Sequence, residues 1–439
     1  MNYPAYPHYK PSGVGWLGNV PKHWDVKRLK MAANYWVSNV DKVPSEDELP
    51  VRLCNYTDVY YNDRIEPGMG LMETTATAEE IRHFGLRVGD ILLTKDSEEW
   101  NDIAIPALVV ATSPDLVCGY HLAIVRPKAR MLLGRFLLRA LQSCAVNQQF
   151  QIAATGVTRY GLPKSAIGEA QIPLPPLPDQ RVIADFLDVE TAKLDMLIAK
   201  KQELIEKLKE KRTALISRTV TRGLPPEAAR AAGLNPNPKL KSSGIEWLGE
   251  IPEHWEVKQL KWAIMFQRGH DLPTDDREDG TVPVVTSSGV SATHSSAAAK
   301  GPGIVTGRYG TIGQFYLVPE DYWPLNTTLY SIDLRGNEPR FLRYMLTHLS
   351  PLFLLNAVKS AVPGVDRNDI HPTKAVVPPV QEQRAIADYL DREMATIDQM
   401  VEKVQAAMER LQEYRTALIT AAVTGKIDVR GHVHATEAA

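Results

Sequence analysis

Residues 16–30 read WLGNVPKHWDVKRLK, and residues 247–261 read WLGEIPEHWEVKQLK. A second pair of segments matches in the same way, PPLPDQRVIADFLD at 175–188 and PPVQEQRAIADYLD at 378–391. We call the first pair of segments the tryptophan boxes and the second pair the helix-opening boxes. The tryptophan boxes are offset by 231 residues and the helix-opening boxes by 203, so the sequence between the two boxes is 28 residues shorter in the second copy. Because the intervening sequences show little similarity, we predict an internal duplication in which two similar frames hold two different inserts.

Each second box is predicted to open a long helix. Its prolines suit the start of a helix but not the interior, and Asp179 or Glu382 then places an acid at the positive end of the helix dipole. Apolar residues recur at spacings of three, four and seven, which is typical of a coiled coil. They are Ile183, Leu187, Leu194, Leu197, Leu204, Leu208 and Leu215 in the first copy, with Lys201 as a polar exception, and Leu390, Ile397, Val404, Leu411 and Leu418 in the second. Gly223 and Gly425 are the expected stops.

The two helices are expected to pair with each other in opposite directions, although an isolated heptad run would equally suit simple dimerisation. Residues 193–222 contain nine bases and four acids, whereas residues 393–415 contain three bases and five acids, so the helices should attract. If each insert is followed by its own helix, the first helix leads to the second insert and the second helix must run back. The proline-containing residues 224–240 form the predicted linker.

The expected fold class is α+β, with two mixed α/β domains separated by two long helices in an antiparallel coiled coil, as a pseudo-twofold repeat. The predicted segments are a first domain with an N-terminal segment, a helix, a linker, a second domain, a second helix and a tail, at residues 1–178, 179–223, 224–240, 241–380, 381–425 and 426–439. Within the inserts, we expect strands at 104–110 and 120–125 and helices at 134–151 and 340–355.

Basic loops in the inserts are the candidate binding residues. Lys95 follows a predicted strand in the first insert, and Arg308 and Tyr309 lie among glycines that let the backbone approach a surface closely. An arginine fork can bind phosphate or a guanine edge. A second loop precedes each long helix, residues 155–160 with Arg159 and Tyr160, and residues 363–367 with Arg367. The structural alternatives are tight hairpins, arginines paired with carboxylates of their own domain, and a packing role for Tyr160.

Composition and motifs exclude several classes of protein. The 439 residues are 44% hydrophobic and 23% charged, typical of several globular domains, and a net charge of -2 means that any nucleic-acid surface must be local. No window is apolar enough for a membrane span and no signal peptide is recognisable, so we expect a cytoplasmic protein. The three cysteines, Cys54, Cys118 and Cys144, are expected to be buried thiols. No catalytic or metal-binding motif is found, which favours a binding protein.

The two boxes, each present twice, resemble those of the specificity (S) subunits of Type I restriction-modification systems, and the resemblance covers the chain to about residue 425. It implies that each insert is a target recognition domain for one half of a bipartite site on double-stranded DNA. It also implies that the helices set the distance between the halves and dock two methyltransferase (M) subunits, and that restriction (R) subunits join the complex. Helices of about 60 Å, compared with about 34 Å per turn of DNA, predict a spacer of a few base pairs.

S-adenosylmethionine, ATP and Mg are then expected on the partner subunits, with no cofactor in this chain. The candidate DNA contacts carried over are Lys95, Arg159, Tyr160, Arg308, Tyr309 and Arg367, while Gln180, Arg181, Gln383 and Arg384 match the helix-opening box and suit the frame. Two alternatives stay open. One is a coiled-coil adaptor that bridges protein partners without touching DNA, and the other is an enzyme hidden in one insert.

Overall fold

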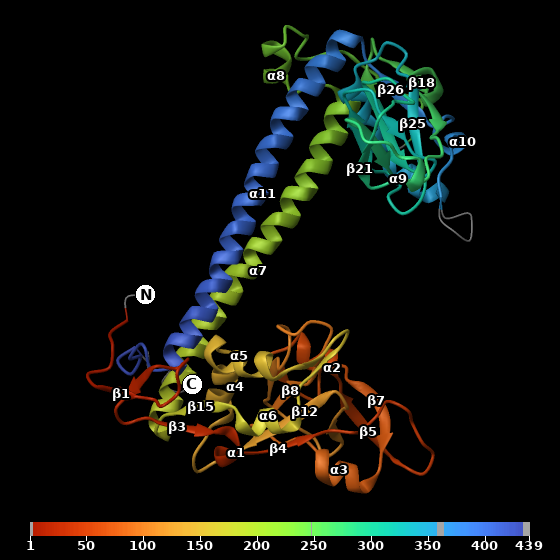
Figure 1. Ribbon diagram of the computed structural model, residues 1–439. Coiled ribbons are helices and arrows are strands. Elements are labelled where there is room, and N and C mark those ends of the chain that lie inside the picture. Colours follow the sequence, from red (N-terminus) through yellow and green to blue (C-terminus); the bar gives the residue numbers. More distant parts are fainter. Residues whose placement is uncertain (1–2, 247, 358–363, 433–439) are drawn as a thin grey trace. The chain divides into compact units, whose positions relative to one another are not determined.

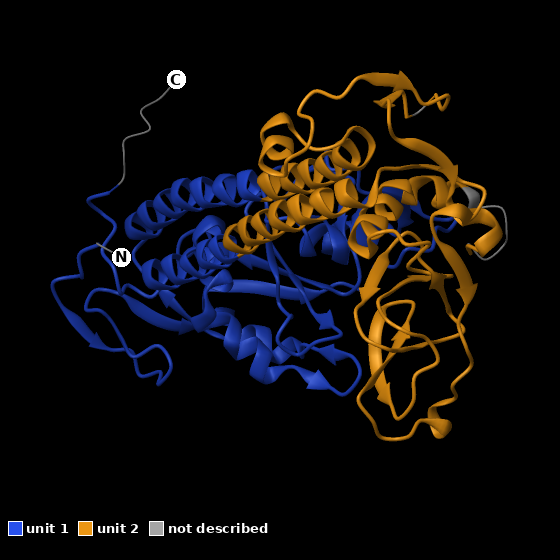
Figure 2. Cartoon of the chain, turned by 90° about the horizontal axis from the view of Figure 1, so that it is seen from above, with its two compact units in different colours: residues 1–201, 406–439 blue, residues 202–405 orange. Residues whose placement is uncertain are grey.

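The computed structural model describes residues 3–246, 248–357 and 364–432. The chain forms two compact units, which Figure 2 colours separately: residues 1–201 with 406–439, and residues 202–405. Two long helices, α7 (Leu177–Arg222) and α11 (Val380–Val423), each begin in one unit and end in the other. Gly223 and Gly425 follow these helices with positive φ angles, so the predicted stops are confirmed.

Unit 1 is built on a five-stranded sheet in the order β4-β12-β8-β10-β6, of which Figure 1 labels β4, β8 and β12. Its strands are Ala33–Val37 (β4), Leu122–Pro127 (β12), Ile91–Thr94 (β8), Pro106–Val109 (β10) and Arg64–Ile65 (β6). A second sheet, in the order β11-β5-β7, contains Leu116–Cys118, Leu49–Cys54 and Met72–Ala76. Helix α4 (Gly134–Gln142) packs across β8, β10 and β12, and buries Phe136, Leu137 and Leu141 in a core shared with α5 (Cys144–Ala153) and both long helices.

Unit 2 repeats this plan with a smaller sheet, in the order β19-β25-β22-β23. Its strands are Met265–Arg268, Thr328–Asp333, Gly303–Gly307 and Phe315–Val318, and a second sheet pairs β20 (Val282–Thr286) with β21 (Gly289–His294) and β24 (Trp323–Pro324). Helix α9 (Pro339–Ala357) packs on β22 and β23. The α+β class and the duplication of the frame are therefore confirmed.

Within each unit the two long helices pair in opposite directions. In unit 1, Asp195 of α7 accepts a hydrogen bond from Arg415 of α11 at 2.9 Å, and residues near the start of α7, such as Leu187, share a core with Leu418 and Ile419 near the end of α11. In unit 2, Arg212 of α7 binds Asp398 of α11, and Ile216 shares a core with Leu390. The predicted attraction between a basic α7 and an acidic α11 therefore fits the ion pair of unit 2, whereas the pair of unit 1 has its acid on α7 and its base on α11.

The seam of α7 differs from the prediction. Leu197 and Leu204 are 47% and 44% exposed, whereas Ile205 is buried. The seam runs through Leu194, Ile198, Lys201, Ile205 and Leu208, which are all buried or half-buried at alternating spacings of four and three. Leu197 and Leu204 lie beside this seam. The prediction assigned them to it because leucines at seven-residue spacing fit either of two neighbouring stripes along a helix, and spacing alone does not distinguish the two.

Several boundaries also differ. The helix expected over 134–151 breaks at Ser143, whose extended backbone (φ -70°, ψ 140°) separates α4 from α5 and whose hydroxyl accepts from Val146 N. The predicted linker contains a short helix, α8 (Pro226–Ala231). In the expected tail, Ile427 and Val429 are buried in unit 1, whereas residues 433–439 lie outside the described part of the chain.

The repeated frame starts earlier than the tryptophan boxes. The hairpin β1 (Tyr9–Pro11) with β2 (Asn19–Pro21) recurs as β16 (Leu240–Ser242) with β17 (Glu250–Pro252), at the same offset of 231 residues. Similarly, β3 (Asp25–Arg28) pairs with β15 (Gln171–Leu174), and β18 (Glu256–Gln259) pairs with β26 (Lys374–Val377). The strand before each long helix is thus paired with a strand inside the tryptophan box, at residues 16–30 in the first copy and 247–261 in the second.

Candidate nucleic-acid interface

The two candidate loops of unit 1 lie side by side. Lys95 follows the last residue of β8, and β9 (Asp96–Ser97) pairs with β14 (Tyr160–Gly161), which itself pairs with β13 (Thr155–Gly156). The backbone N–H of Leu162 donates to the carbonyl of Lys95 at 2.7 Å. Lys95 and the loop with Arg159 and Tyr160, which are 64 residues apart in sequence, therefore form one surface.

The two candidate loops of unit 2 meet in the same way. Arg308 follows β22, the strand that corresponds to β8 in the sheet order. Its carbonyl accepts a hydrogen bond from Val365 N at 2.9 Å, and Tyr309 forms a β-bridge with Gly364. Arg367 begins α10 (Arg367–Ile370), three residues after that bridge, while Pro363 lies outside the described residues. In both units, the loop that follows the equivalent strand, β8 or β22, thus adjoins the loop that precedes the long helix.

The charge of Lys95 is already engaged. Its Nζ lies 2.7 Å from Asp96 Oδ2, and Asp96 also binds the ring of His121. Burial alone would raise the pKa of Asp96, but the hydrogen bonds from Lys95 and His121 outweigh it and lower the pKa below its usual value. Lys95 is also only 22% exposed. Its contribution to DNA binding stays a prediction, and its visible role is to hold Asp96.

The arginines are differently placed. Arg159, Arg308 and Arg367 have no ion pair within 4 Å in the described ranges. The guanidinium carbon of Arg308 lies 5.2 Å from the ring centroid of Tyr309, which is 45% exposed, and no described group accepts a hydrogen bond from its Nε. Arg308 and Tyr309 therefore present an arginine fork and an aromatic face together. Tyr160 is half-buried against the core of unit 1, which favours packing.

Sequence reasoning missed a pocket beside Arg159. It has a volume of about 800 Å³ and is lined by Tyr56, Thr57, Tyr60, Tyr61, Asp96, Ser97, Glu98, Glu99, Asp102, Thr158 and Arg159. The rings of Tyr56 and Tyr60, from α2 (Tyr56–Tyr60), are stacked with centroids 5.6 Å apart. A hydrogen bond to Asp102 raises the pKa of Tyr60 to about 12. The tyrosines at 56–61 and the acids at 96–102 could have indicated the pocket. About 40 residues separate the two groups, however, so no local pattern in the sequence brings them together.

Carboxylates and aromatic rings suit the amino groups and faces of bases, since Asp and Glu accept from cytosine N4 and rings stack on any base. The pocket is therefore chemically suited to base edges, and Arg159 at its border is suited to a phosphate. In unit 2, Arg308 and Tyr309 offer donors and a ring instead. The two units carry different chemistry at equivalent places.

The repeated tryptophan boxes hold the start of each long helix. In unit 1, the indole Nε1 of Trp24 donates to Asp179 Oδ2 at 3.2 Å, and His23 lies 2.8 Å from the same oxygen. In unit 2, Trp255 Nε1 donates to Glu382 Oε2 at 2.9 Å, and His254 binds the other oxygen of that carboxylate. The acid at the start of each long helix, which was predicted to interact favourably with the helix dipole, thus also binds the histidine and the tryptophan of the box. Both histidines thus help to hold the carboxylate at the start of a long helix.

Glutamines fix the same helix starts to the inserts. Gln180 accepts from Leu133 N at 2.9 Å and donates to the carbonyls of Met131 and Pro175. Its copy Gln383 accepts from Glu338 N and donates to the Pro378 carbonyl. Both glutamines are fully buried. Their predicted role in the frame is confirmed.

An arginine–aspartate cluster follows about two turns later on each helix. Arg139 of α4 is buried and binds Asp188 and Thr191, while Arg340 of α9 binds Asp388 and Asp391. Burial alone would raise the pKa of Asp188, but the hydrogen bonds from Arg139 and Arg135 lower it overall. The candidate loops thus extend from a sheet whose covering helix is bound to the start of the long helix.

Other expected features have mixed outcomes. Cys54 and Cys118 are buried free thiols, but Cys144 is exposed at the first turn of α5, so that part of the prediction was wrong. Within the described residues, no group of three or more His, Cys, Asp or Glu side chains is placed to hold a metal ion. No helix in the described part of the chain is both long and apolar enough to cross a membrane.

Two units with matched frames and dissimilar candidate loops define a duplicated two-domain protein, and comparison with known proteins gives its family. The model of the Type I restriction modification DNA specificity domain matches residues 74–207 and 252–409. The chain belongs to this family of Type I restriction-modification specificity subunits.

Curated relatives share its length and a modest identity. The chain is 22% identical over 433 residues to the MjaX specificity subunit, assigned to a type I restriction enzyme of Methanocaldococcus jannaschii, with 94% of this chain and 96% of the relative covered. It is 25% identical over 326 residues to the type I restriction enzyme EcoBI specificity subunit of Escherichia coli, covering 67% and 65%.

Solved structures confirm the fold. A chain from a study of complex assembly and conformational transition of the type I R-M system aligns with a TM-score of 0.64 and 16% identity, over 94% of this chain and 99% of that one. The HsdS subunit from Thermoanaerobacter tengcongensis aligns with a TM-score of 0.50 and 16% identity, over 93% and 98%.

Proposed function

We propose that each unit reads one half of a bipartite site on double-stranded DNA. The observation that carries the proposal is the shared placement of the two candidate loops, which adjoin after β8 in unit 1 and after β22 in unit 2. Because each pair of loops includes an unpaired arginine, each unit can bind phosphates locally although the whole chain has a net charge of -2. Different side chains around these arginines then supply different base preferences.

The proposal gives this chain recognition and gives catalysis to its partners. Two M subunits would dock on the helices and methylate adenine with S-adenosylmethionine, and R subunits would add ATP- and Mg-dependent cleavage in the cytoplasm. No cofactor is assigned to this chain. A coiled-coil adaptor that never touches DNA has no support in the comparisons, and it predicts no protection of DNA by the assembled complex.

Exchange of residues 31–174 for the corresponding insert of another family member tests the division of labour. We expect one half of the methylated motif to change and the other half to stay, because the loops of each unit lie within its own insert. Mapping of methylated adenines in a host genome measures both halves at once. The reciprocal exchange of residues 262–377 is the control and should change the other half. A motif that is unchanged by either exchange would contradict the proposal.

Arg308→Ala is expected to weaken binding to the half-site of unit 2 by about 1–3 kcal/mol, because an unpaired arginine fork is lost from the loop surface. Base discrimination in that half should relax, while discrimination in the other half stays. Binding titrations of the assembled complex with duplexes altered in one half measure both effects. Arg335→Ala is the matched control, since Arg335 is exposed in the same unit but paired with Asp333 at 3.0 Å. Equal affinities for the two variants would exclude a role for Arg308.

A further inference from the structure

The pocket beside Arg159 in unit 1, which we call the tyrosine pocket, is lined by an acid and a base that do not pair with each other. Asp102 and Arg159 both line it. In the part of the chain that the structure describes, neither side chain has an ion pair within 4 Å. Opposite charges that line one pocket without pairing keep their hydrogen-bonding capacity for a third group. The pocket is therefore suited to a ligand that presents both donors and acceptors.

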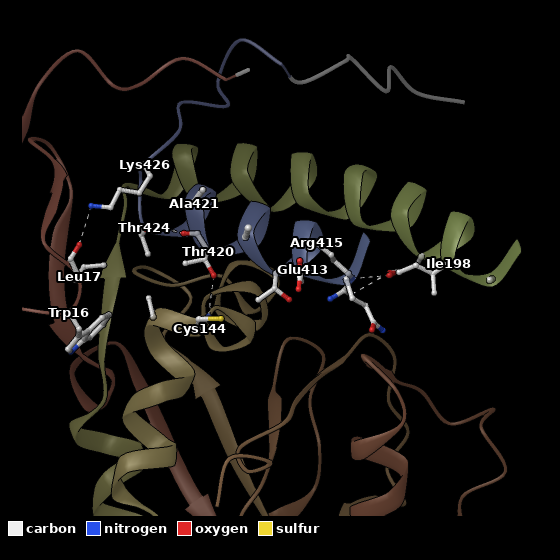
Figure 3. Close-up of a pocket in the computed structure, with 16 residues that line it drawn as sticks. Trp16, Leu17, Cys144, Ile198, Glu413, Arg415, Thr420, Ala421, Thr424 and Lys426 are labelled. Carbon is white, nitrogen blue, oxygen red and sulfur yellow. Dashed lines mark hydrogen bonds and ion pairs between the residues drawn. The ribbon is translucent and has the colours of Figure 1, made fainter. Parts of the chain in front are cut away.

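The larger groove of unit 1, with a volume of about 1140 Å³, shows the opposite arrangement (Figure 3). The Arg415 guanidinium pairs there with Asp195 at 2.9 Å. Lys426 Nζ donates to the carbonyl of Leu17 at 3.2 Å, a contact that Figure 3 also shows. The cations that line this groove are therefore engaged by the chain itself, whereas Arg159 has no such partner among the described residues.

Tyr60 holds the carboxylate of the tyrosine pocket in a fixed orientation. Its hydroxyl donates to Asp102 Oδ2 at 2.7 Å, and this hydrogen bond raises the pKa of Tyr60 to about 12, so the hydroxyl remains a donor at neutral pH. The other oxygen of Asp102 accepts no hydrogen bond from any residue that the structure describes. Asp102 is thus an oriented acceptor with one oxygen available.

Arg159 reaches the same pocket from the hairpin of β13 and β14, at whose turn Val157 is 89% exposed. A two-stranded ribbon is one of the elements that the major groove of DNA admits. Burial raises the pKa of Tyr56, and the nearby charge of Arg159 partly offsets this effect. The ring of Tyr56 stacks in turn on Tyr60, which binds Asp102. The two tyrosines therefore connect the guanidinium with the carboxylate across the pocket.

The remaining acids of the pocket distinguish between two possible targets of Arg159. An arginine fork binds a phosphate or a guanine edge. Glu98 and Glu99 also line the pocket, are exposed, and have no ion pair within 4 Å in the described ranges. Because carboxylates repel phosphates, they favour the guanine edge as the target of an arginine in this pocket.

A C·G base pair matches this arrangement of an acceptor beside a fork of donors. In the major groove, cytosine presents its N4 amino group as a donor, and guanine presents O6 and N7 as acceptors. A carboxylate pairs with the cytosine amino group, and an arginine pairs with both guanine acceptors. A T·A pair would instead place the O4 acceptor of thymine against the carboxylate, which has no proton to donate.

We infer that the tyrosine pocket reads one C·G base pair in the half-site of unit 1, with Asp102 accepting from cytosine N4 and Arg159 donating to guanine O6 and N7. Tyr60 is a positioning residue, because it orients Asp102. The inference rests on the proposed function, under which unit 1 reads half of a bipartite site, and it specifies the base pair and the residues that read it.

A binding selection on duplexes randomised in this half-site tests the inference with the full chain assembled with its M subunits. The unsubstituted complex should select a C·G pair at one position. Asp102→Asn and Arg159→Lys should each reduce discrimination at that position by at least about fivefold, the smaller contribution expected of one such pairing. Arg159→Lys keeps the charge but loses the fork, so a phosphate contact alone would leave discrimination unchanged. Asp47→Asn is the matched control, because Asp47 is an exposed acid of the same insert that does not line the pocket.

Two further measurements separate base reading from effects on folding. Replacement of the selected guanine by 7-deazaguanine removes the N7 acceptor, and it should weaken binding of the unsubstituted complex but not of Arg159→Lys. Tyr60→Phe should reduce the preference for cytosine while Asp102 remains, because the carboxylate loses its fixed orientation. A merely structural role of Tyr60 would weaken binding to all half-sites equally.

The outcomes distinguish the inference from the proposed function. Unchanged discrimination in both Asp102→Asn and Arg159→Lys would overturn the inference and leave the proposed function intact. Loss of discrimination at two different base pairs, or selection of a half-site without a C·G pair, would do the same. If the unsubstituted complex selects no sequence in this half-site, the proposed function fails along with the inference.

Discussion

Trp255→Ala is expected to destabilise unit 2 by about 3–5 kcal/mol, the range for truncation of a fully buried tryptophan. The ring joins three parts of the unit. Its Nε1 donates to Glu382 in the first turn of α11, its six-membered ring packs against Gly223 directly after α7, and Trp255 itself directly precedes β18. Loss of the ring therefore leaves a cavity where both long helices meet the insert, and leaves the Glu382 carboxylate with His254 alone.

Hydrogen exchange monitored by mass spectrometry measures this loss unit by unit. Peptides from the core of unit 2 should exchange about 10² to 4 × 10³ times faster, since each 1.4 kcal/mol corresponds to a factor of ten. Trp262→Ala is the matched control, because Trp262 lies in the same unit but is 61% exposed, and it should change exchange little. Trp24→Ala should give a loss of similar size in unit 1. A change below about 1 kcal/mol for Trp255→Ala would show that the box does not hold the unit together.

The repeat made the frame predictable from the sequence. Two boxes repeated in order located both long helices to within a few residues, identified Gln180 and Gln383 as frame residues, and implied that the helices pair in opposite directions. The duplication allows the chain to be aligned with itself. Residues such as Trp24 and Trp255 recur in this alignment because each makes the same contact in its own unit.

The binding surface was less predictable, for physical reasons. Lys95 is a candidate cation in sequence, but its ammonium is paired with Asp96, whose carboxylate also binds His121, a residue 25 positions away that local sequence does not connect with it. The pocket beside Arg159 combines α2 with segments about 40 and 100 residues away, so no local pattern contains it. Apolar periodicity predicted a single helix over residues 134–151. Instead, α4 ends before Ser143, whose hydroxyl caps the start of α5.

Removal of one heptad from each long helix is expected to abolish recognition of the native bipartite site. Deletion of residues 198–204 together with 406–412 preserves the seam and both interhelical ion pairs, because Asp195, Arg212, Asp398 and Arg415 lie outside the deleted segments. If the helices set the distance between half-sites, that distance shortens by about 10 Å at 1.5 Å per residue. This corresponds to about 3 base pairs at about 3.4 Å each. Because the two units could then engage only one half of the native site at a time, affinity should fall at least about 10³-fold.

Sites with a shorter spacer should recover only part of that affinity. Removal of 3 base pairs also rotates one half-site by about 100° around the DNA axis, given 10–10.5 base pairs per turn, whereas removal of a heptad rotates a helix by only about 20°. A binding selection on duplexes of varied spacer length measures both effects. Duplication of the same two heptads is the control, and it should favour a spacer about 3 base pairs longer. Since the ruler role requires distance to follow helix length, an unchanged preferred spacer in both variants would mean that the helices do not measure the DNA.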